Sequence, residues 1–316
     1  MKKWLAAILV LMMFAVLAAC GAEKEATDSQ TADAQTAETV TVTHELGETE
    51  VPKNPEKVVV FDFGILDTLD QLGIESIAGV PQGNVPSYLE KFEDTGKYEN
   101  VGTLKEADFE AIHAMDPDLI IISGRQAEMY NEFNDIAPTI HLGVDTTDYM
   151  NSFTTNMETV GEIFGKEAEV EEELAAINEK IEGIKEKTAS SKEKGLIVLA
   201  NEGKVSAYGA ASRFGIIHDV FGVKQADEGI EASTHGQSIT YEYILDTNPD
   251  MMFVVDRNAA VGNDASAKDS LENELVQKTN AYQNDKIIYL DPDYWYLSGG
   301  GLQSVSEMVK AIESAF

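Results

Sequence analysis

Two stretches of the chain share one pattern: EAIHAMDPDLIIISGR at residues 110–125 and EYILDTNPDMMFVVDR at residues 242–257. In each stretch a Glu is followed after six residues by Pro-Asp, and after six more residues by an Arg. The part before Pro-Asp reads as a helix, and the apolar run after it is typical of a buried strand. A helix–strand–Arg unit that occurs twice predicts an internal duplication and two similar lobes.

The arginines that close these units are scarce. Arg125, Arg213 and Arg257 are the only arginines among 23 basic residues, in a chain with 56 acidic residues. Arg125 and Arg257 follow apolar strands, and ligands of open parallel sheets bind beyond the carboxyl ends of strands. We expect the three guanidinium groups to converge on an anionic ligand between the lobes. The alternative is that each Arg pairs with a surface acid and contributes little.

Outside the repeat, short apolar runs alternate with helical segments, which is typical of the α/β class. A hairpin is expected at 39–51, and a segment at 214–223 echoes 63–74. A closing helix is expected at 304–316, after a flexible Ser-Gly-Gly-Gly at 298–301. The sequence predicts two Rossmann-like lobes with parallel-sheet cores, whose strands are expected at 57–63, 76–80, 119–123, 139–143, 195–200, 204–209, 251–255 and 286–290.

The segment 149–194 is charged and helical throughout, and Gly165 divides it into two helices. The second, from residue 166 to about residue 189, carries one apolar stripe at spacings of three and four: Val170, Leu174, Ile177, Ile181 and Ile184. A coiled-coil arm is the alternative. Because strand patterns resume at 195, we expect one long helix packed along both lobes, joining an N-terminal lobe (39–148) to a C-terminal lobe (195–316).

The first residues read as a targeting segment. Lys2 and Lys3 precede a short apolar run, and residues 1–19 are expected to be a signal peptide. Leu-Ala-Ala-Cys at 17–20 resembles a bacterial lipobox and contains the only Cys of the chain. We expect Cys20 to be lipidated, with 20–38 as a flexible tether to the extracytoplasmic face of the cell membrane. Ordinary secretion with an incidental Cys is the alternative.

The formal net charge of −33 argues against nucleic acid and anionic membrane surfaces as partners. No phosphate-binding loop, dinucleotide fingerprint or nucleophile elbow is present in the sequence, so we expect the chain to have no ATPase activity of its own. The histidines have no metal-ligand spacing, which predicts no intrinsic metal site and no intrinsic cofactor; they are His44, His113, His141, His218 and His235.

Several stretches resemble the substrate-binding lipoproteins of bacterial iron–siderophore ABC transporters, especially the petrobactin-binding lipoproteins of bacilli. They are VPKNPEKVVVFDFGILDTLDQLGI (51–74), VGTLKEADFEAIHAMDPDLIII (101–122), STHGQSITYEYI (233–244) and YLDPDYWYLSGGGLQS (289–304). The resemblance implies a binding protein and not an enzyme, a monomer with two lobes bridged by one helix. It also implies a ferric catecholate or mixed citrate–catecholate siderophore in the cleft, delivered to a separate permease and ATPase. The siderophore, and not the protein, would ligate the iron.

Other side chains are candidates for the same ligand. Tyr130, Tyr294, Trp295 and Tyr296 are expected to form aromatic walls, although Trp295 is equally suited to core packing. His235 lies in a polar loop, and we expect it to donate to a ligand oxygen, unless it is incidental.

Two acidic residues at equivalent positions have a different expected role. The resemblance implies that Glu110 and Glu242 dock onto arginines of the permease, one from each lobe. The alternative is that acids are favoured in first helical turns by the helix dipole.

Two rival functions stay open at this point. A cobalamin or haem carrier on the same fold would use a Tyr or His in the cleft. A secreted hydrolase that cleaves the siderophore would need a nucleophile and a base, for which Ser233 and His235 are near each other in sequence.

Overall fold

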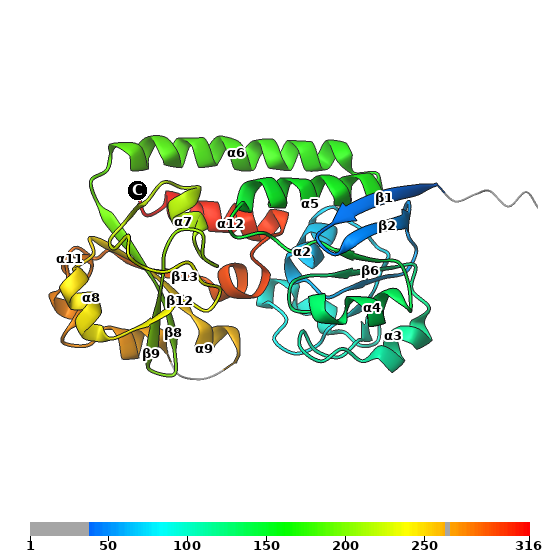
Figure 1. The fold of residues 1–316 in the computed structure, drawn as a ribbon, viewed down its shortest axis with the longest axis horizontal. Helices are drawn as coiled ribbons and strands as arrows, with labels where there is room; N and C mark the ends of the chain where they lie inside the picture. Colours follow the sequence, from blue (N-terminus) through cyan, green and yellow to red (C-terminus); the bar gives the residue numbers. More distant parts are fainter. Residues whose placement is uncertain (1–37, 263–265) are drawn as a thin grey trace, which may run out of the picture. The chain divides into compact units, whose positions relative to one another are not determined.

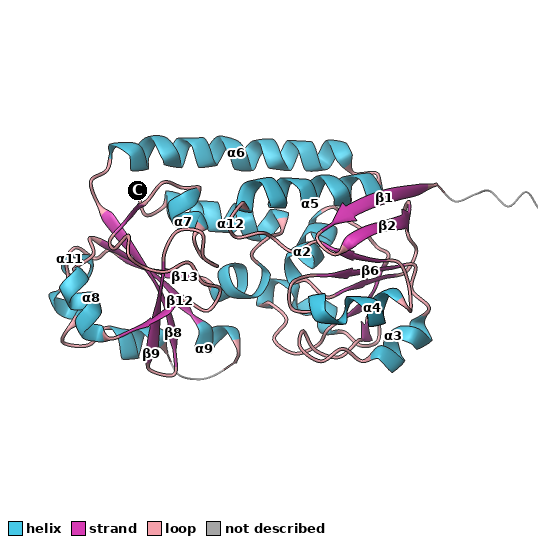
Figure 2. Cartoon of the chain, viewed as in Figure 1, coloured by secondary structure: helices cyan, strands magenta, loops and turns pink. Residues whose placement is uncertain are grey.

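The computed structural model describes residues 38–262 and 266–316, which form two lobes with a long helix along them (Figures 1 and 2). The expected signal peptide, Cys20 and the tether up to residue 37 lie outside the described residues. Within the described part, no helix combines the length and the apolar character needed to span a membrane.

The N-terminal lobe contains an all-parallel sheet in the order β5-β4-β3-β6-β7 and an antiparallel hairpin, β1-β2. Its strands are β1 (Thr39–His44), β2 (Gly47–Pro52), β3 (Val58–Val60), β4 (Ile77–Val80), β5 (Glu99–Asn100), β6 (Leu119–Ile122) and β7 (Thr139–His141). Its helices are α2 (Phe63–Gln71), η1 (Ser87–Glu93), α3 (Phe109–Met115), η2 (Ala127–Met129) and α4 (Tyr130–Asn134).

The C-terminal lobe contains a mixed sheet in the order β11-β9-β8-β12-β13, with β10 also paired to β8. Its strands are β8 (Lys194–Asn201), β9 (Lys204–Tyr208), β10 (Lys224–Gln225), β11 (Gln237–Ile239), β12 (Met251–Asp256) and β13 (Ile287–Leu290). Its helices are α7 (Ile216–Asp219), α8 (Tyr241–Thr247), α9 (Arg257–Ala260), α10 (Ala267–Leu271), η3 (Val276–Lys278), α11 (Asn280–Gln283), the π-helical η4 (Asp293–Ser298) and α12 (Leu302–Glu313).

The repeated Pro-Asp unit has the same local structure in both lobes. α3 and α8 each begin at a side-chain N-cap, and each ends at a residue with left-handed backbone, Asp116 and Asn248. The Pro-Asp carboxylates then bind the start of the neighbouring strand. Asp118 accepts from the N–H of Lys57 at 2.8 Å, and Asp250 accepts from the N–H of Lys194 at 3.1 Å. The repeat therefore specifies where β6 and β12 begin.

The α/β class and the two lobes are confirmed, but the C-terminal sheet is not purely parallel. β8 and β9 pair antiparallel, with Asn201 opposite Lys204. The two residues between them, Glu202 and Gly203, have φ of 51° and 76°. Two consecutive positive φ values form the tight turn that suits a two-residue hairpin, so the chain reverses here instead of crossing over.

The long helix is α6 (Glu167–Ser190), which follows α5 (Tyr149–Phe164). Its buried residues include the whole predicted apolar stripe. They belong to one hydrophobic core that contains Val58 and Ile121 of the first sheet and Ile197 and Phe253 of the second. Alternate residues of the same strands face a separate core on the other side of each sheet, which explains why these strands are apolar throughout.

The N-terminus of α12 is held by a buried carboxylate of α2. Asp67 is fully buried and accepts from the N–H of Gln303 at 3.3 Å and of Ser304 at 3.1 Å. The Tyr88 hydroxyl lies 3.0 Å from Asp67 Oδ2. This junction ties the N-terminal lobe to the C-terminal segment of the chain.

The Gly-rich segment at 298–301 is part of this junction, so the expectation of a flexible link was wrong. Ser298 is buried, and α12 begins directly after Gly301. A Cβ at Gly301 would lie 1.9 Å from Asp67 Oδ1, and a Cβ at Gly64 would lie 2.3 Å from the Ser298 carbonyl oxygen. Glycine is required here because α2 and the backbone before α12 touch.

We predict that Asp67 makes stability depend on pH. Burial raises the pKa of Asp67 to about 7, although hydrogen bonds from Ser304 and Tyr88 oppose this rise. Since the unfolded value is near 3.8, the folded state holds the proton more tightly, and this contribution to stability is lost as pH rises through 7. The free energy of unfolding should fall by about 3 kcal/mol from pH ~5 to pH ~8 in urea titrations. The Asp67→Asn variant should lack this fall. Asp70→Asn, on the same helix, is the control and should retain it.

Candidate ligand-binding cleft

Three adjoining cavities surround Tyr296. Their volumes are about 240, 260 and 520 Å³, and Tyr296 lines all three. Arg213 and His235 line two of them, as do Arg125 and Arg257. Residues of both lobes line the largest cavity, so the three together form one cleft between the lobes.

Strand ends position the side chains of the cleft. In the N-terminal lobe, Asp62 follows β3, Arg125 follows β6 and Gly143 follows β7. In the C-terminal lobe, Asn201 ends β8 and Arg257 follows β12 at the start of α9. The carboxyl ends of parallel strands thus line the cleft from both sides, as expected for this class of sheet.

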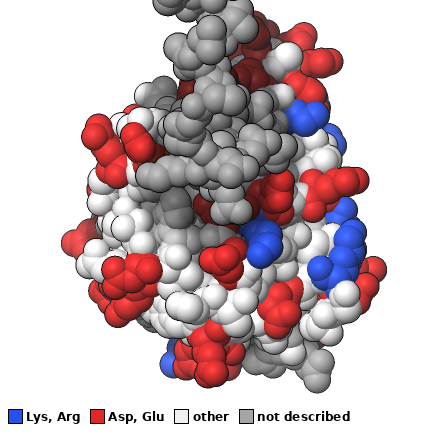
Figure 3. Space-filling model, turned by 90° about the vertical axis from the view of Figure 1, so that its right-hand side faces the viewer, with Lys and Arg blue, Asp and Glu red and all other residues white. Residues whose placement is uncertain are grey.

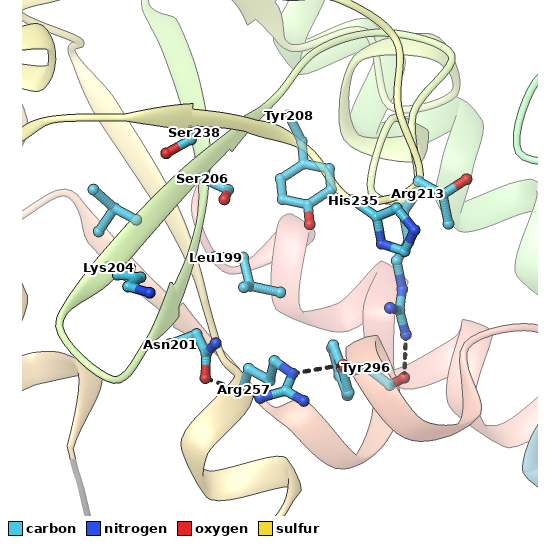
Figure 4. Close-up of a pocket in the computed structure, with 12 residues that line it drawn as sticks. Leu199, Asn201, Lys204, Ser206, Tyr208, Arg213, His235, Ser238, Arg257 and Tyr296 are labelled. Carbon is cyan, nitrogen blue, oxygen red and sulfur yellow. Dashed lines mark hydrogen bonds between the residues drawn. The ribbon is translucent and has the colours of Figure 1, made fainter. Parts of the chain in front are cut away.

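Arg257 is held by two uncharged groups (Figure 4). Its Nε donates to the Tyr296 hydroxyl at 3.0 Å, and its Nη1 donates to Asn201 Oδ1 at 2.9 Å. Arg213 also contacts Tyr296: its Nη2 donates to the backbone carbonyl at 2.7 Å, and its guanidinium lies 4.1 Å from the ring centroid. Tyr296 therefore links two of the three arginines.

None of the three arginines lies within 4.0 Å of a carboxylate in the described part of the chain. The structure thus lacks the pairing with surface acids that was the alternative explanation. Arg125 is exposed and lines the two larger cavities. Burial lowers the pKa of Arg213, and the charge of Arg125 lowers it further, so the fields of these two groups overlap. The part of the cleft around these arginines is therefore positive.

The face of the molecule at the right-hand end of Figure 1 has the opposite character. Acidic side chains are spread over the described part of the face drawn in Figure 3, interspersed with fewer basic ones. This distribution agrees with the net charge of −33. The cleft keeps its positive charge because Asn201 and Tyr296 bond the guanidinium groups without neutralising them.

Of the other predicted ligand residues, His235 and Trp295 line the cleft, whereas Tyr294 and Tyr130 do not. His235 is exposed and lines two of the cavities, and Trp295 is 4% exposed but lines the largest one. Tyr294 packs against Tyr88, with ring centroids 4.6 Å apart. Tyr130 does not join the cleft. Its hydroxyl lies 3.3 Å from Thr49 Oγ1 on the β1-β2 hairpin, because α4 packs beside that hairpin and away from the strand ends.

Glu110 and Glu242 are both exposed and occupy the first turns of α3 and α8. They do not line the cavities of the cleft. Their equivalence within the repeat is therefore matched by equivalent local structure.

Sequence reasoning missed cleft residues on both sides, among them Glu45, Asp62, His141, Tyr149 and Asn201. Only Asp62 had a local signal, since an Asp before a helix is a typical N-cap, and it accepts from the N–H of Ile65 at 2.9 Å. Across residues 38–262 and 266–316, no three His, Cys, Asp or Glu side chains gather as a metal site.

Comparisons with known proteins bear on this site. Residues 58–294 match the family described as periplasmic binding protein. The petrobactin-binding protein YclQ of Bacillus subtilis is 52% identical over 99% of this chain and 98% of its own length. Its crystal structure has a TM-score of 0.85 and covers 88% of this chain and 98% of that one. The catecholate-siderophore binding protein VctP of Vibrio cholerae is 34% identical, with a TM-score of 0.84, covering 88% of this chain and all (100%) of that one.

We predict that the two arginines control the ionisation of Tyr296. Burial raises the pKa of this phenol, but Arg213 and Arg257 more than offset burial, and the net pKa is lowered. The ultraviolet titration of the wild type minus that of Tyr296→Phe should show one phenol that ionises below the usual pKa of about 10. In an Arg257→Gln background the same difference should move to higher pH. An unchanged difference would contradict the contact, and Lys185→Gln on α6 provides the control for loss of one positive charge.

Proposed function

The chain belongs to the periplasmic binding protein family, and on that premise we propose that it captures a ferric siderophore for an ABC importer. The ligand is a catecholate or mixed citrate–catecholate complex, similar to ferric petrobactin. The observation that carries the proposal is the set of three arginines around Tyr296, none paired with a carboxylate within the described residues.

The chemistry of such a ligand matches the cleft. A ferric tris-catecholate carries about three negative charges on planar rings, and guanidinium groups donate to oxygen anions and stack on aromatic faces. At ~5 Å and an effective dielectric near 20, each pair contributes about 3 kcal/mol before desolvation. Three convergent arginines suit a multiply charged ligand, whereas the scattered acids of the surface repel non-specific anions.

Two relatives support the same ligand class, since one is named for petrobactin and the other for catecholate siderophores. The hydrolase alternative is disfavoured because Ser233 Oγ accepts from the backbone N–H of His235, at 3.1 Å, and no bond joins it to the imidazole. A haem or cobalamin carrier is disfavoured because the Tyr296 phenol is already bonded to Arg257.

The protein delivers its ligand as a monomer to a permease and an ATPase that are separate chains. Cys20 carries a lipid that anchors it to the extracytoplasmic face of the membrane, and residues 20–38 form the tether. The protein catalyses no reaction and has no cofactor of its own, because the iron is held through the siderophore. Glu110 and Glu242 are exposed at equivalent places on the two lobes and dock onto basic residues of the permease.

We predict that each of Arg125→Gln, Arg213→Gln and Arg257→Gln weakens binding of a ferric catecholate by about 10- to 100-fold, the effect of one charge-assisted hydrogen bond. Trp295 is the only Trp after residue 4, so fluorescence quenching of the processed chain reports binding at the cleft.

Lys185→Gln removes one positive charge on α6, away from the cleft, and should bind like the wild type. Unchanged affinity in all three arginine variants would rule out the proposed site. Retention of haem or cobalamin absorption bands in place of the catecholate band would favour the alternative carriers.

We predict that reversing both docking charges, Glu110→Lys with Glu242→Lys, abolishes siderophore uptake by cells while leaving binding unchanged. The matched control is Glu172→Lys with Glu179→Lys, two exposed acids of α6. Normal uptake by the double variant of Glu110 and Glu242 would exclude the docking role.

A further inference from the structure

The N-terminal wall of the largest cavity contains two buried polar atoms that have no hydrogen-bond partner. They are Nε2 of His141 and the hydroxyl of Tyr149, and no other buried side-chain polar atom of the described residues lacks a partner. Both side chains line the cavity, and they are only 6% and 7% exposed. An unpaired buried polar atom costs about 1–3 kcal/mol. Two of them on one wall of a cleft point to a ligand group that supplies the missing partners.

Two carboxylates line the same wall. Glu45 lies in the turn of the β1-β2 hairpin, and its Oε2 is 3.7 Å from Nδ1 of His141. Asp62 caps α2 with one carboxylate oxygen, Oδ1, and its other oxygen has no hydrogen-bond donor in the described chain. We call Glu45, Asp62, His141 and Tyr149 the acceptor wall.

The hydrogen-bonding character of this wall follows from the state of His141. Burial lowers the pKa of His141, against the opposing effect of Glu45 and Asp62, so the imidazole is neutral at neutral pH. The carboxylate beside Nδ1 favours the tautomer with its hydrogen on Nδ1, and Nε2 then presents a lone pair. Burial raises the pKa of Tyr149, and Asp67 and Asp62 raise it further, so its phenol keeps its proton. The phenol oxygen still accepts a hydrogen bond.

Such a wall fits a cation that is rich in hydrogen-bond donors. Two carboxylates, an imidazole lone pair and a phenol oxygen all accept, and an ammonium group has three N–H donors and no acceptor. The opposite side of the cleft, which we call the arginine pole, has the reverse character, since the guanidinium groups of Arg213 and Arg257 only donate hydrogen bonds. The cleft is therefore bipolar.

Two simpler occupants do not account for the wall. Arg125 lines the same cavity, but it forms no ion pair with Glu45 or Asp62 within 4.0 Å. A directly bound metal ion is also a poor fit, because the described residues contain no cluster of three His, Cys, Asp or Glu ligands.

We propose that the acceptor wall is a second subsite, which binds a protonated amine carried by the siderophore. This inference rests on the proposed function. The arginine pole binds the anionic ferric centre, and the acceptor wall selects ligands whose arm ends in an ammonium group.

The test compares two synthetic ferric catecholates in calorimetric titrations of the protein. One probe carries a butyl arm on each catechol amide, and the other carries the same arm with a terminal amine. We expect the wild type to bind the amine probe about tenfold more tightly than the butyl probe, as for a hydrogen bond to a charged group.

Two variants test the wall itself. Tyr149→Phe removes a hydroxyl that has no partner, so the unliganded protein should be as stable as the wild type or slightly more stable. Asp62→Asn keeps a good N-cap for α2 but removes the charge. Each should reduce the preference for the amine probe, measured as the ratio of its affinity to that of the butyl probe, about threefold or more. The matched controls are Tyr98→Phe, an equally buried Tyr, and Asp108→Asn, the N-cap of α3.

The outcomes separate the subsite from the proposed function. If neither probe binds, the proposed function fails and the subsite fails with it. If both probes bind the wild type equally, the cleft is a siderophore site and the subsite is excluded. If both variants keep the preference for the amine probe, the subsite is also excluded. An equal loss of affinity for both probes in Asp62→Asn excludes it too, because that result would show that the acid acts through Arg125.

Discussion

The buried carboxylate of Asp67 accepts hydrogen bonds from the N-terminus of α12, and the geometry of the cleft depends on this contact. A carboxylate removed from water is tolerated only when its partners are well placed. Tyr88 and the close approach of Gly301 therefore have to be maintained around it. η4 ends three residues before Gly301, so the junction also sets the position of Tyr296. Tyr296 in turn holds Arg213 and Arg257, and the arrangement of the arginine pole follows from a buried acid outside the cleft.

The cleft retains positive charge in a strongly acidic chain because its arginines are oriented by uncharged groups. A carboxylate partner would orient a guanidinium equally well, but it would neutralise the charge that an anionic ligand needs. Asn201 and Tyr296 orient it without that loss. A π-helical turn is rare and frequently occurs at functional sites, and here η4 places both the phenol and the backbone carbonyl of Tyr296 against arginines.

The features that were predictable are those whose cause is local. The Pro-Asp repeat marks two helix ends and two strand starts, and the apolar stripe of α6 marks its buried face, because caps and periodicity act over a few residues. The features that were missed depend on distant contacts or on one turn. The turn at Glu202-Gly203 makes β9 run antiparallel to β8, and the Gly-rich segment packs on α2. Tyr130 lies beside Thr49 of the β1-β2 hairpin, 81 residues earlier in the chain.

The sequence by itself determined the α/β class, the two lobes, the bridging helix and the placement of Arg125 and Arg257 at strand ends, because these follow from periodicity and from a repeated motif. Only the tertiary structure decided which side chains face one another across the cleft. The pairing of Arg257 with Asn201, and the acceptor wall that joins Glu45 to His141, bring together residues 56 and 96 positions apart. No local pattern encodes such contacts, since they depend on how the strand ends of each sheet and the loops around them are brought together by the packing of α2, α6 and α12.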